Sequence, residues 1–386
     1  MIVIIGGGAC GLLSGVILAQ KGERVTVVER NSTVGKKIVV SGNGRCNITN
    51  KNISLKDYLK GDKNLIKSLL NRFGFSEAKR LFSSLGIELM ISEDGRVFPL
   101  SLNGKSVVEV LLGHLKSLKV ELLLNSEVID VQKEGEDFLV ELKDKKIEAK
   151  KLIVCSGSRA YKSVGVSDIG YRIAKKFGHS VKDLYPSLVQ VECGDRLVHR
   201  ASGVKIYSKV SVYDGKEKLH DSEGDLLFTN YGLSGLVILD SSFYISQAKG
   251  NVSLKVDLMP KISHDELVSM LDKRLKLKDI LDYESWLGAV IPKKLIPLVS
   301  RGKLLNKKSV KELAYNIKNL KIKIDNLRDE KYAEIIAGGV DSREVDSSTL
   351  ESKKVKNLFF GGEVLDVAGK RGGYNLHFAF GCAYSL

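Results

Sequence analysis

Residues 2–12 read IVIIGGGACGL, and this stretch decides the fold of the chain. An apolar run typical of a buried strand ends in the motif Gly6-x-Gly8-x-x-Gly11, and residues 9–21 continue with the apolar spacing of a helix. Gly6 permits a tight turn, Gly8 allows a pyrophosphate to approach the backbone, and Gly11 allows the helix to pack closely on the strand. The stretch therefore predicts the strand–turn–helix unit of a dinucleotide-binding fold.

A second strand is expected at residues 24–29, and it ends in an acid. Glu29 stands 18 residues after Gly11, close to the spacing at which an acidic side chain reaches the ribose of a bound dinucleotide. We expect its carboxylate to accept hydrogen bonds from the ribose hydroxyls. This interaction suits FAD and NAD equally, so the N-terminal motif alone does not choose between them.

The C-terminal part of the chain favours FAD. Residues 359–366 read FFGGEVLD, a strand that ends in glycines and acids, and residues 369–376 read GKRGGYNL and open a final helix. A second strand–glycine–acid–helix arrangement so far from the first motif is typical of a fold that returns to a long, extended cofactor. We expect an acid here to hold ribityl or pyrophosphate oxygens, and the helix that begins near Asn375 to direct its positive end at the flavin ring.

The middle of the chain reads as an insertion. In the first part, helices are expected at 64–72, 76–85 and 104–117, and strands at 120–124, 127–132, 138–142 and 147–155. Beyond Pro186, residues 188–258 read as mostly short alternating strands and residues 263–317 as helices. Beta-type segments ending in glycine then resume at 334–340 and 357–362, followed by a helix at 374–386.

We therefore expect an α/β protein whose Rossmann-like FAD-binding domain is interrupted. The FAD-binding domain takes residues 1–189 and 333–386, a β-rich inserted domain takes 190–262 and 318–332, and a basic helical subdomain takes 263–317.

Composition narrows the class of protein further. Hydrophobic residues make up 43% of the 386 residues, so a disordered chain is excluded. The five cysteines contain no C-x-x-C pair, so we predict reduced thiols, no disulfide framework and no bound metal. No apolar run reaches ~18 residues, and no basic segment precedes the first strand. We expect a cytoplasmic protein with no membrane partner.

The motifs together resemble those of a known family. The stretches GGGACGL (6–12), SGNGRCNITN (41–50), GGEVLD (361–366) and GGYNL (372–376) look like those of the BaiN/YhiN-like flavoproteins, which are FAD-dependent oxidoreductases. The resemblance implies a glutathione-reductase-like flavin domain interrupted by a β-barrel-like domain that carries a helical segment. Beside Gly6 of the first motif, it implies FAD contacts at Gly8, Cys10, Gly11, Glu29, Lys37, Gly42, Arg45, Cys46, Asn47, Val128, Gly157, Gly362, Glu363, Asp366, Gly373, Asn375 and Leu376.

Two side chains are candidates for catalysis. Cys46 stands beside Arg45, whose charge would lower the thiol pKa, and a thiol could protonate a carbon while the flavin delivers hydride to its neighbour. The alternative is a small residue packed against the ring. His377, where the family usually has Gln, is either a proton donor or a capping and packing residue. No second G-x-G-x-x-G follows, so NAD(P)H would enter the flavin site and alternate with substrate; oxygen is an alternative electron acceptor.

The charge is strongly positive, with 61 Lys and Arg against 46 Asp and Glu, a net +15. Residues 36–80 hold eleven basic residues, and residues 293–323 hold ten against Glu312 alone. The two basic blocks suit the phosphates of RNA, although each alone is also typical of a solvated face. The predicted RNA-binding residues are Lys293, Lys294, Arg301, Lys303, Lys307, Lys308 and Lys311.

Several hypotheses about function follow. The resemblance implies reduction of a conjugated C=C bond, either in uridine of ribosomal RNA, giving dihydrouridine, or in a small bile-acid-like enone. An amine-type oxidase that uses oxygen, and an RNA-binding protein with a purely structural flavin, are further alternatives. Because the charge of +15 is useful for RNA and not for a small neutral substrate, uridine reduction is the leading hypothesis, with NAD(P)H as reductant.

Overall fold

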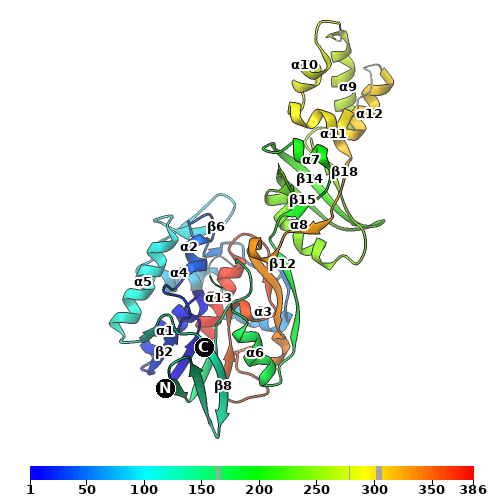
Figure 1. The fold of residues 1–386 in the computed structure, drawn as a ribbon. Coiled ribbons are helices and arrows are strands. Elements are labelled where there is room, and N and C mark those ends of the chain that lie inside the picture. Colours follow the sequence, from blue (N-terminus) through cyan, green and yellow to red (C-terminus); the bar gives the residue numbers. More distant parts are fainter. Residues whose placement is uncertain (162–164, 166, 278, 301–306) are drawn as a thin grey trace. The chain divides into compact units, whose positions relative to one another are not determined.

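The computed structural model describes residues 1–161, 165, 167–277, 279–300 and 307–386. The chain forms two compact units (Figure 1). The first unit comprises Met1–Tyr185 and Ile335–Leu386, and the second comprises Pro186–Glu334. The second unit is therefore one continuous stretch of chain, whereas the first is assembled from two.

A five-stranded parallel sheet lies at the centre of the first unit. Its order is β21–β11–β1–β2–β7, and its bounds are Leu358–Phe360, Lys151–Val154, Ile2–Ile5, Val25–Val28 and Glu121–Leu123. Ile5, the last residue of β1, pairs with Val28 on one side and with Val154 on the other. Strands β1 and β2 consist of buried, mainly branched apolar residues, as expected where helices cover both faces of a parallel sheet.

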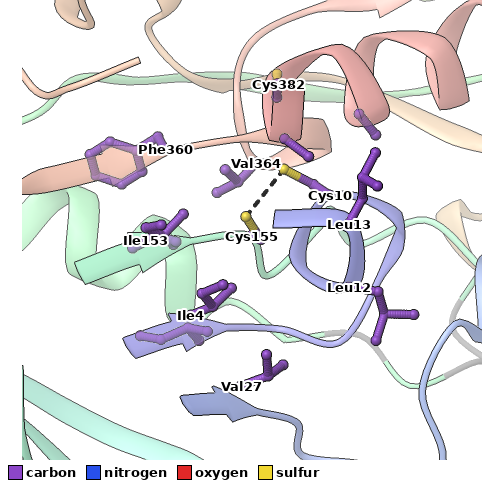
Figure 2. Packing of buried hydrophobic residues seen from close by; sticks show 14 of the residues in the cluster. Ile4, Cys10, Leu12, Leu13, Val27, Ile153, Cys155, Phe360, Val364 and Cys382 are labelled. Carbon is purple, nitrogen blue, oxygen red and sulfur yellow. Dashed lines mark hydrogen bonds between the residues drawn. The ribbon is translucent and has the colours of Figure 1, made fainter. Parts of the chain in front are cut away.

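Helix α1 follows β1 and is buried along nearly its whole length. It packs against α13 and α5, and its Leu12, Leu13 and Val16 are fully buried. Figure 2 shows Cys10 of α1 pointing at Cys155, which follows β11, with a distance of 3.2 Å between the two sulfur atoms. The helices of this unit are α1 (Ala9–Gln20), α2 (Lys36–Val40), α3 (Lys63–Arg72), α4 (Phe75–Ser84), α5 (Gly104–Ser117), α6 (Ile169–Lys176) and α13 (Tyr374–Ser385).

One predicted strand proves to be two. The sequence predicts a single strand at 147–155, but β10 (Lys146–Ala149) pairs antiparallel with β9 (Asp137–Leu142), whereas β11 joins the parallel sheet. The break falls at Lys150, whose N–H donates to the Met1 carbonyl (2.9 Å). The strands predicted at 127–132 and 138–142 are present as β8 (Val128–Glu134) and β9, which pair with each other and form a three-stranded sheet with β10.

Short two- and three-stranded pairings complete the first unit. They are β3 (Thr49–Asn50) with β6 (Arg96–Pro99) and β5 (Leu89–Ile91), β4 (Tyr58–Lys60) with β22 (Ala368–Gly369), and β12 (Val181–Ser187) with β20 (Ile335–Val340). The pairing of β4 with β22 ties the segment after the first cofactor motif to the segment before α13.

The second unit is built on a seven-stranded antiparallel sheet of order β18–β17–β14–β15–β16–β13–β19. The strand bounds are Leu320–Lys323, Val252–Asp257, Lys205–Asp214, Glu217–Phe228, Gly232–Ser234, Val191–Glu192 and Asn326–Leu327. The two edge strands, β18 and β19, are separated in sequence only by Ile324 and Asp325. Such a short connection requires the sheet to curl until its edges approach each other, which gives the expected barrel-like character.

In the second unit, the sequence predicts the helices of one segment and misses the helices of another. The predicted helical segment 263–317 contains α9 (His264–Arg274), α10 (Tyr283–Gly288), α11 (Ile296–Ser300) and α12 (Lys307–Lys318). The sequence predicts mostly short strands over 188–258, and strands β13 to β17 lie there, but the prediction misses α7 (Arg196–Arg200) and α8 (Leu236–Gln247). Helix α8 packs on β15 and β14. Throughout the described ranges, every helix is too short or too polar to cross a bilayer.

A pair of glycine substitutions tests the packing of β1 on α1. A Cβ at Gly11 would lie 1.9 Å from the Gly6 carbonyl oxygen, whereas a Cβ at Gly8 would meet nothing within 4 Å. We expect Gly11→Ala to lower the free energy of unfolding by roughly 2 kcal/mol or more. Gly8→Ala only replaces the N-cap glycine by a residue less favourable at that position, so it should lower the free energy of unfolding by less than about 1 kcal/mol. Urea denaturation of both variants measures the difference, and equal losses would contradict this account of the turn.

Candidate flavin site

The turn between β1 and α1 is closed on one side and open on the other. A Cβ at Gly6, whose φ is +107°, would lie 2.4 Å from the Cys155 carbonyl oxygen, so strand β11 closes that side. The space next to Gly8 is free of atoms within 4 Å of a Cβ position. Gly8 is also the N-cap of α1 and offers no side chain to its first N–H groups. Free N–H groups at the start of a helix suit the oxygens of a phosphate.

Glu29 links this turn to the loop that follows β2. Its Oε2 accepts a hydrogen bond from the Gly7 N–H (2.8 Å), and its Oε1 accepts from the N–H (2.8 Å) and the side-chain amide (2.7 Å) of Asn31. The Glu29 carbonyl oxygen accepts from the Ser126 N–H (2.9 Å), which places the start of β8, at Val128, near the same loop. A carboxylate has lone pairs beyond these bonds, so Glu29 can still accept from a ribose hydroxyl.

Lys37 joins the loop after β2 to the C-terminal motif. Its Nζ lies 2.5 Å from Glu363 Oε2 and 3.4 Å from Ser158 Oγ. Glu363 belongs to the 3-10 turn Gly362–Val364, and a Cβ at Gly362 would lie 3.1 Å from Cys10 Cβ. Residues from four distant parts of the sequence therefore meet beside the β1–α1 turn.

The start of α13 is the second point of convergence. Gly373, the N-cap of α13, has φ of +97°, and a Cβ there would lie 2.5 Å from the Thr49 carbonyl oxygen and 2.8 Å from Asn47 Oδ1. The Asn375 amide is used locally, because it accepts from the Gly369 N–H and donates to the carbonyls of Gly369 and Lys370. Like α1, helix α13 begins without a side-chain cap, so its first N–H groups are available to an electron-rich ligand atom.

Cys46 lies in the loop between α2 and β3. The expectation that Arg45 lowers the pKa of its thiol is wrong. The side chain is fully buried, and burial raises the pKa of the thiol to about 12. Arg45 gives no compensation, because its guanidinium lies 5.2 Å from the centre of the Phe98 ring and its Nε donates to the Gly42 carbonyl (3.3 Å). Cys46 is therefore a protonated, neutral thiol at neutral pH. Its complete burial, and not its protonation state, favours the packing alternative.

His377 lies in the core of the first unit, with none of its surface exposed. Its Nε2 lies 2.8 Å from the Phe73 carbonyl oxygen, so this nitrogen carries the proton and donates. Nδ1 then accepts from the Thr49 hydroxyl (2.7 Å). Burial lowers the pKa of His377 to about 4, which keeps the ring neutral. Both nitrogens are engaged, and this geometry favours the packing alternative for His377.

Glu363 pairs with Lys37, whereas Asp366 lies beside Lys60. The Lys60 ammonium of β4 lies 3.4 Å from Asp366 Oδ1, and burial raises the pKa of this carboxyl above its usual value. Within the part of the chain that the structure describes, Oδ1 has no hydrogen-bond partner of good geometry. A buried carboxylate oxygen whose nearby ammonium makes no well-aligned hydrogen bond can still accept from a ligand hydroxyl, such as those of a ribityl chain.

The geometry of the first unit fits FAD. The open space at Gly8, two helix starts without caps and the unsatisfied oxygen of Asp366 match the needs of a pyrophosphate, a flavin ring and a ribityl chain. Gly157 (φ +73°) and the partly buried Leu376 belong to the same unit. The sequence did not point to Asn31, Ser158 or Lys60. Only Asn31 carries a signal, since it stands two residues after Glu29.

The predicted RNA-binding residues belong to the second unit. Lys293 and Lys311 are exposed, and Lys294, also exposed, donates through Nζ to the Ser202 carbonyl (2.8 Å). Arg301 and Lys303 lie outside the described residues. Lys307 and Lys308 belong to α12, but their side chains also lie outside what the structure describes.

Three features define a flavoprotein type of dinucleotide-binding fold: a Rossmann turn open at Gly8, an acid directly after β2, and two helix starts without side-chain caps. The profile of the HI0933-like protein Rossmann domain matches residues 1–386, so the chain belongs to the HI0933-like family. The resemblance inferred from the glycine motifs is thereby confirmed, and the chain is an FAD-dependent oxidoreductase.

Named relatives match this chain over almost its whole length. The 3-dehydro-bile acid delta(4,6)-reductase of Clostridium scindens is 30% identical, over 99% of this chain and 96% of the relative. The ribosomal RNA dihydrouridine synthase of Haemophilus influenzae is 31% identical, with the same coverage. Among solved structures, 3-ketosteroid delta1-dehydrogenase from Sterolibacterium denitrificans shares the fold, with a TM-score of 0.51, 13% identity, and coverage of 99% of this chain and 98% of that one.

Replacement of Glu29 tests its expected place at the ribose. Glu29→Ala removes the acceptor for the ribose hydroxyls, so we expect FAD affinity to fall by ~1–3 kcal/mol. Glu23→Ala is the matched control, because Glu23 is exposed and lies 3.8 Å from Lys151. Titration of the apoprotein with FAD, followed by flavin fluorescence, measures both variants. Unchanged affinity in Glu29→Ala would show that this carboxylate does not hold the cofactor.

The buried His377 predicts a loss of stability in mild acid. Its pKa is about 4 in the folded protein and ~6.5 in the unfolded chain, so between these values the unfolded chain binds more protons. Stability is therefore fully present above pH ~6.5 and is lost as the pH falls toward 4, by on the order of 3 kcal/mol.

The variant His377→Gln isolates this effect, because Gln does not titrate and can still donate to the Phe73 carbonyl. Urea unfolding from neutral pH down to pH ~4 should show a shallower loss of stability than in the unsubstituted protein. Parallel pH profiles for the two proteins would mean that the His377 imidazole is not held neutral.

Proposed function

We propose that the protein reduces the conjugated C=C bond of uridine in ribosomal RNA, giving dihydrouridine, with NAD(P)H as the source of electrons. Two relatives of equal similarity carry names that describe a C=C reductase of a bile acid and a dihydrouridine synthase of ribosomal RNA. A change at a C=C bond is common to both names. The net charge of +15 favours the RNA substrate, because an RNA presents many phosphates and a sterol-sized substrate at most a single charge.

The first unit supplies the binding and orientation that this reaction needs. Bound FAD would supply hydride transfer. The residues proposed to hold it are Gly6, Gly8, Cys10, Gly11, Glu29, Lys37, Gly42, Arg45, Cys46, Asn47, Val128, Gly157, Gly362, Glu363, Asp366, Gly373, Asn375 and Leu376. The Lys37–Glu363 ion pair keeps the loop after β2 beside the C-terminal motif, and the start of α13 offers N–H groups to an electron-rich edge of a ring.

The second unit supplies positive charge for the RNA in this proposal. The proposed contacts are Lys293, Lys294, Arg301, Lys303, Lys307, Lys308 and Lys311. Lys318 of the same basic block is not available, because its Nζ lies 2.7 Å from Asp257 and donates to the carbonyls of Met259 and Ile262. The alternative is reduction of a small bile-acid-like enone, which the first relative supports and which needs none of these lysines.

Mass spectrometry of ribosomal RNA tests the proposal directly. We expect deletion of the gene to remove the mass increase of about 2 Da at one uridine, and the unsubstituted gene to restore it, since reduction adds two hydrogen atoms. Reversal of Lys303, Lys307, Lys308 and Lys311 to Glu should abolish RNA binding and prevent restoration, because repulsion of phosphates replaces attraction.

Reversal of Lys143, Lys145, Lys146 and Lys150 is the matched control, because these exposed lysines of the first unit change the net charge equally. Both variants should retain FAD, and the control should restore the modified uridine. If no uridine changes on deletion, the RNA proposal fails and reduction of a small enone becomes the better account.

A further inference from the structure

One face of the seven-stranded sheet carries lysines that have no acidic partner among the described residues. Side chains alternate along β17 and β18, so Leu254, Leu320 and Ile322 are buried in the core of the second unit. Lys321 and Lys323 lie on the opposite, outward face and are exposed, and Lys255 lies there partly exposed. We call Lys255, Lys321 and Lys323 the lysine face.

The pairing of the strands places like charges against each other. Lys255 of β17 stands directly opposite Lys321 of β18, and Lys323 stands opposite Ser253. In the described part of the chain, none of these three lysines has an ion-pair partner within 4.0 Å. Like charges directly opposite in a sheet are destabilising, so this arrangement is not explained by the stability of the fold.

The neighbouring strands show the opposite arrangement on the same sheet. The acids of β15 are neutralised locally: Asp225 by Lys205 (2.7 Å), Glu223 by Lys209 (3.7 Å) and Asp221 by Lys218 (2.8 Å). Asp257, at the end of β17 itself, is neutralised by Lys318 (2.7 Å). These carboxylates are therefore already engaged and do not cancel the charge of the lysine face. The three lysines are left as a local excess of positive charge.

An aromatic side chain lies on the same outward face. Tyr207 of β14 is 44% exposed, and the Lys261 ammonium lies 5.3 Å from the centre of its ring. Among the described residues of β14, β17 and β18, it is the only large apolar side chain that is exposed. An exposed ring beside the Lys261 ammonium suits stacking with an unpaired base, whereas a surface that binds a bilayer would present aliphatic or several aromatic side chains for insertion.

We propose that the lysine face binds phosphates of an RNA strand, with Tyr207 as a stacking surface for an unpaired base. This inference rests on the proposed RNA substrate and names a surface for it that is separate from α12. Lys321 and Lys323 are held on a rigid strand, on the order of 7 Å apart, because a strand rises ~3.4 Å per residue. Phosphates placed between Lys255 and Lys321 relieve the repulsion between these lysines, so binding recovers the stability that this repulsion costs the free protein.

The test is a triple variant of the full-length flavoprotein, Lys255→Gln, Lys321→Gln and Lys323→Gln. Its matched control is Lys143→Gln, Lys145→Gln and Lys146→Gln, which removes the same charge from an exposed hairpin of the first unit. The probe is deproteinised ribosomal RNA from cells that lack the gene, measured by filter retention between ~50 and ~200 mM salt. FAD content and melting temperature are recorded for each protein.

We expect the triple variant to bind this RNA at least roughly tenfold more weakly, and its log–log salt slope to be flatter by about 2, since each lost phosphate contact removes ~0.7. The control should bind like the unsubstituted protein. The triple variant should keep its FAD and melt no lower than the unsubstituted protein, because the substitutions remove a like-charge pair.

The possible outcomes separate this inference from the proposed function. If the unsubstituted protein forms dihydrouridine but the triple variant binds RNA with unchanged affinity and salt slope, the lysine face is not an RNA site and the proposed function stands. If RNA binds through the lysine face but no uridine is reduced, the proposed function fails and this inference stands. Binding of phosphatidylglycerol vesicles that depends on the three lysines, without RNA binding, would overturn both.

Discussion

The close approach of Gly11 to the carbonyl oxygen of Gly6 is the constraint on which the first unit depends. It sets the distance between β1 and α1, and through α1 it sets the position of α13, which packs on the same helix. Because α13 begins at the loop containing Asn47 and Thr49, a change in the first turn is transmitted to the second cofactor motif. The two motifs, more than 350 positions apart in the sequence, therefore behave as one structural element.

Two polar links, one partly buried and one fully buried, hold this element together. The Lys37–Glu363 pair and the bond between Thr49 and His377 each connect the loop after β2 to the C-terminal segment. Links of this kind contribute little net stability, but breaking one leaves a buried polar group without a partner. Their value is in fixing one arrangement of the loop relative to the helix start, which a cofactor bound along both motifs requires.

The sequence predicted the parts of the structure whose signals are local. The strand–glycine–helix unit, the C-terminal motif and the helices of 263–317 were all marked by spacing or by glycine. Helix α8 was missed because its sequence, LVILDSSFYISQ, is rich in β-branched and aromatic residues and apolar over much of its surface, a composition typical of a strand. The pKa of Cys46 was misjudged because Arg45 is its neighbour in sequence, while the guanidinium lies on Phe98 instead. Lys318 belongs to a lysine-rich stretch whose sequence is typical of a solvated face, but its side chain is only 13% exposed because it pairs with Asp257.

The interruption of the first unit also constrains how the protein is made. Strand β21 and helix α13, which complete the parallel sheet and cover α1, are synthesised only after all of Pro186–Glu334. At ~5–20 residues per second, the N-terminal βαβ segment waits for on the order of ten seconds or more on the ribosome with its apolar surfaces uncovered. The second unit is continuous and can fold during that interval, so it is expected to reach its native structure before the first unit, which begins the chain.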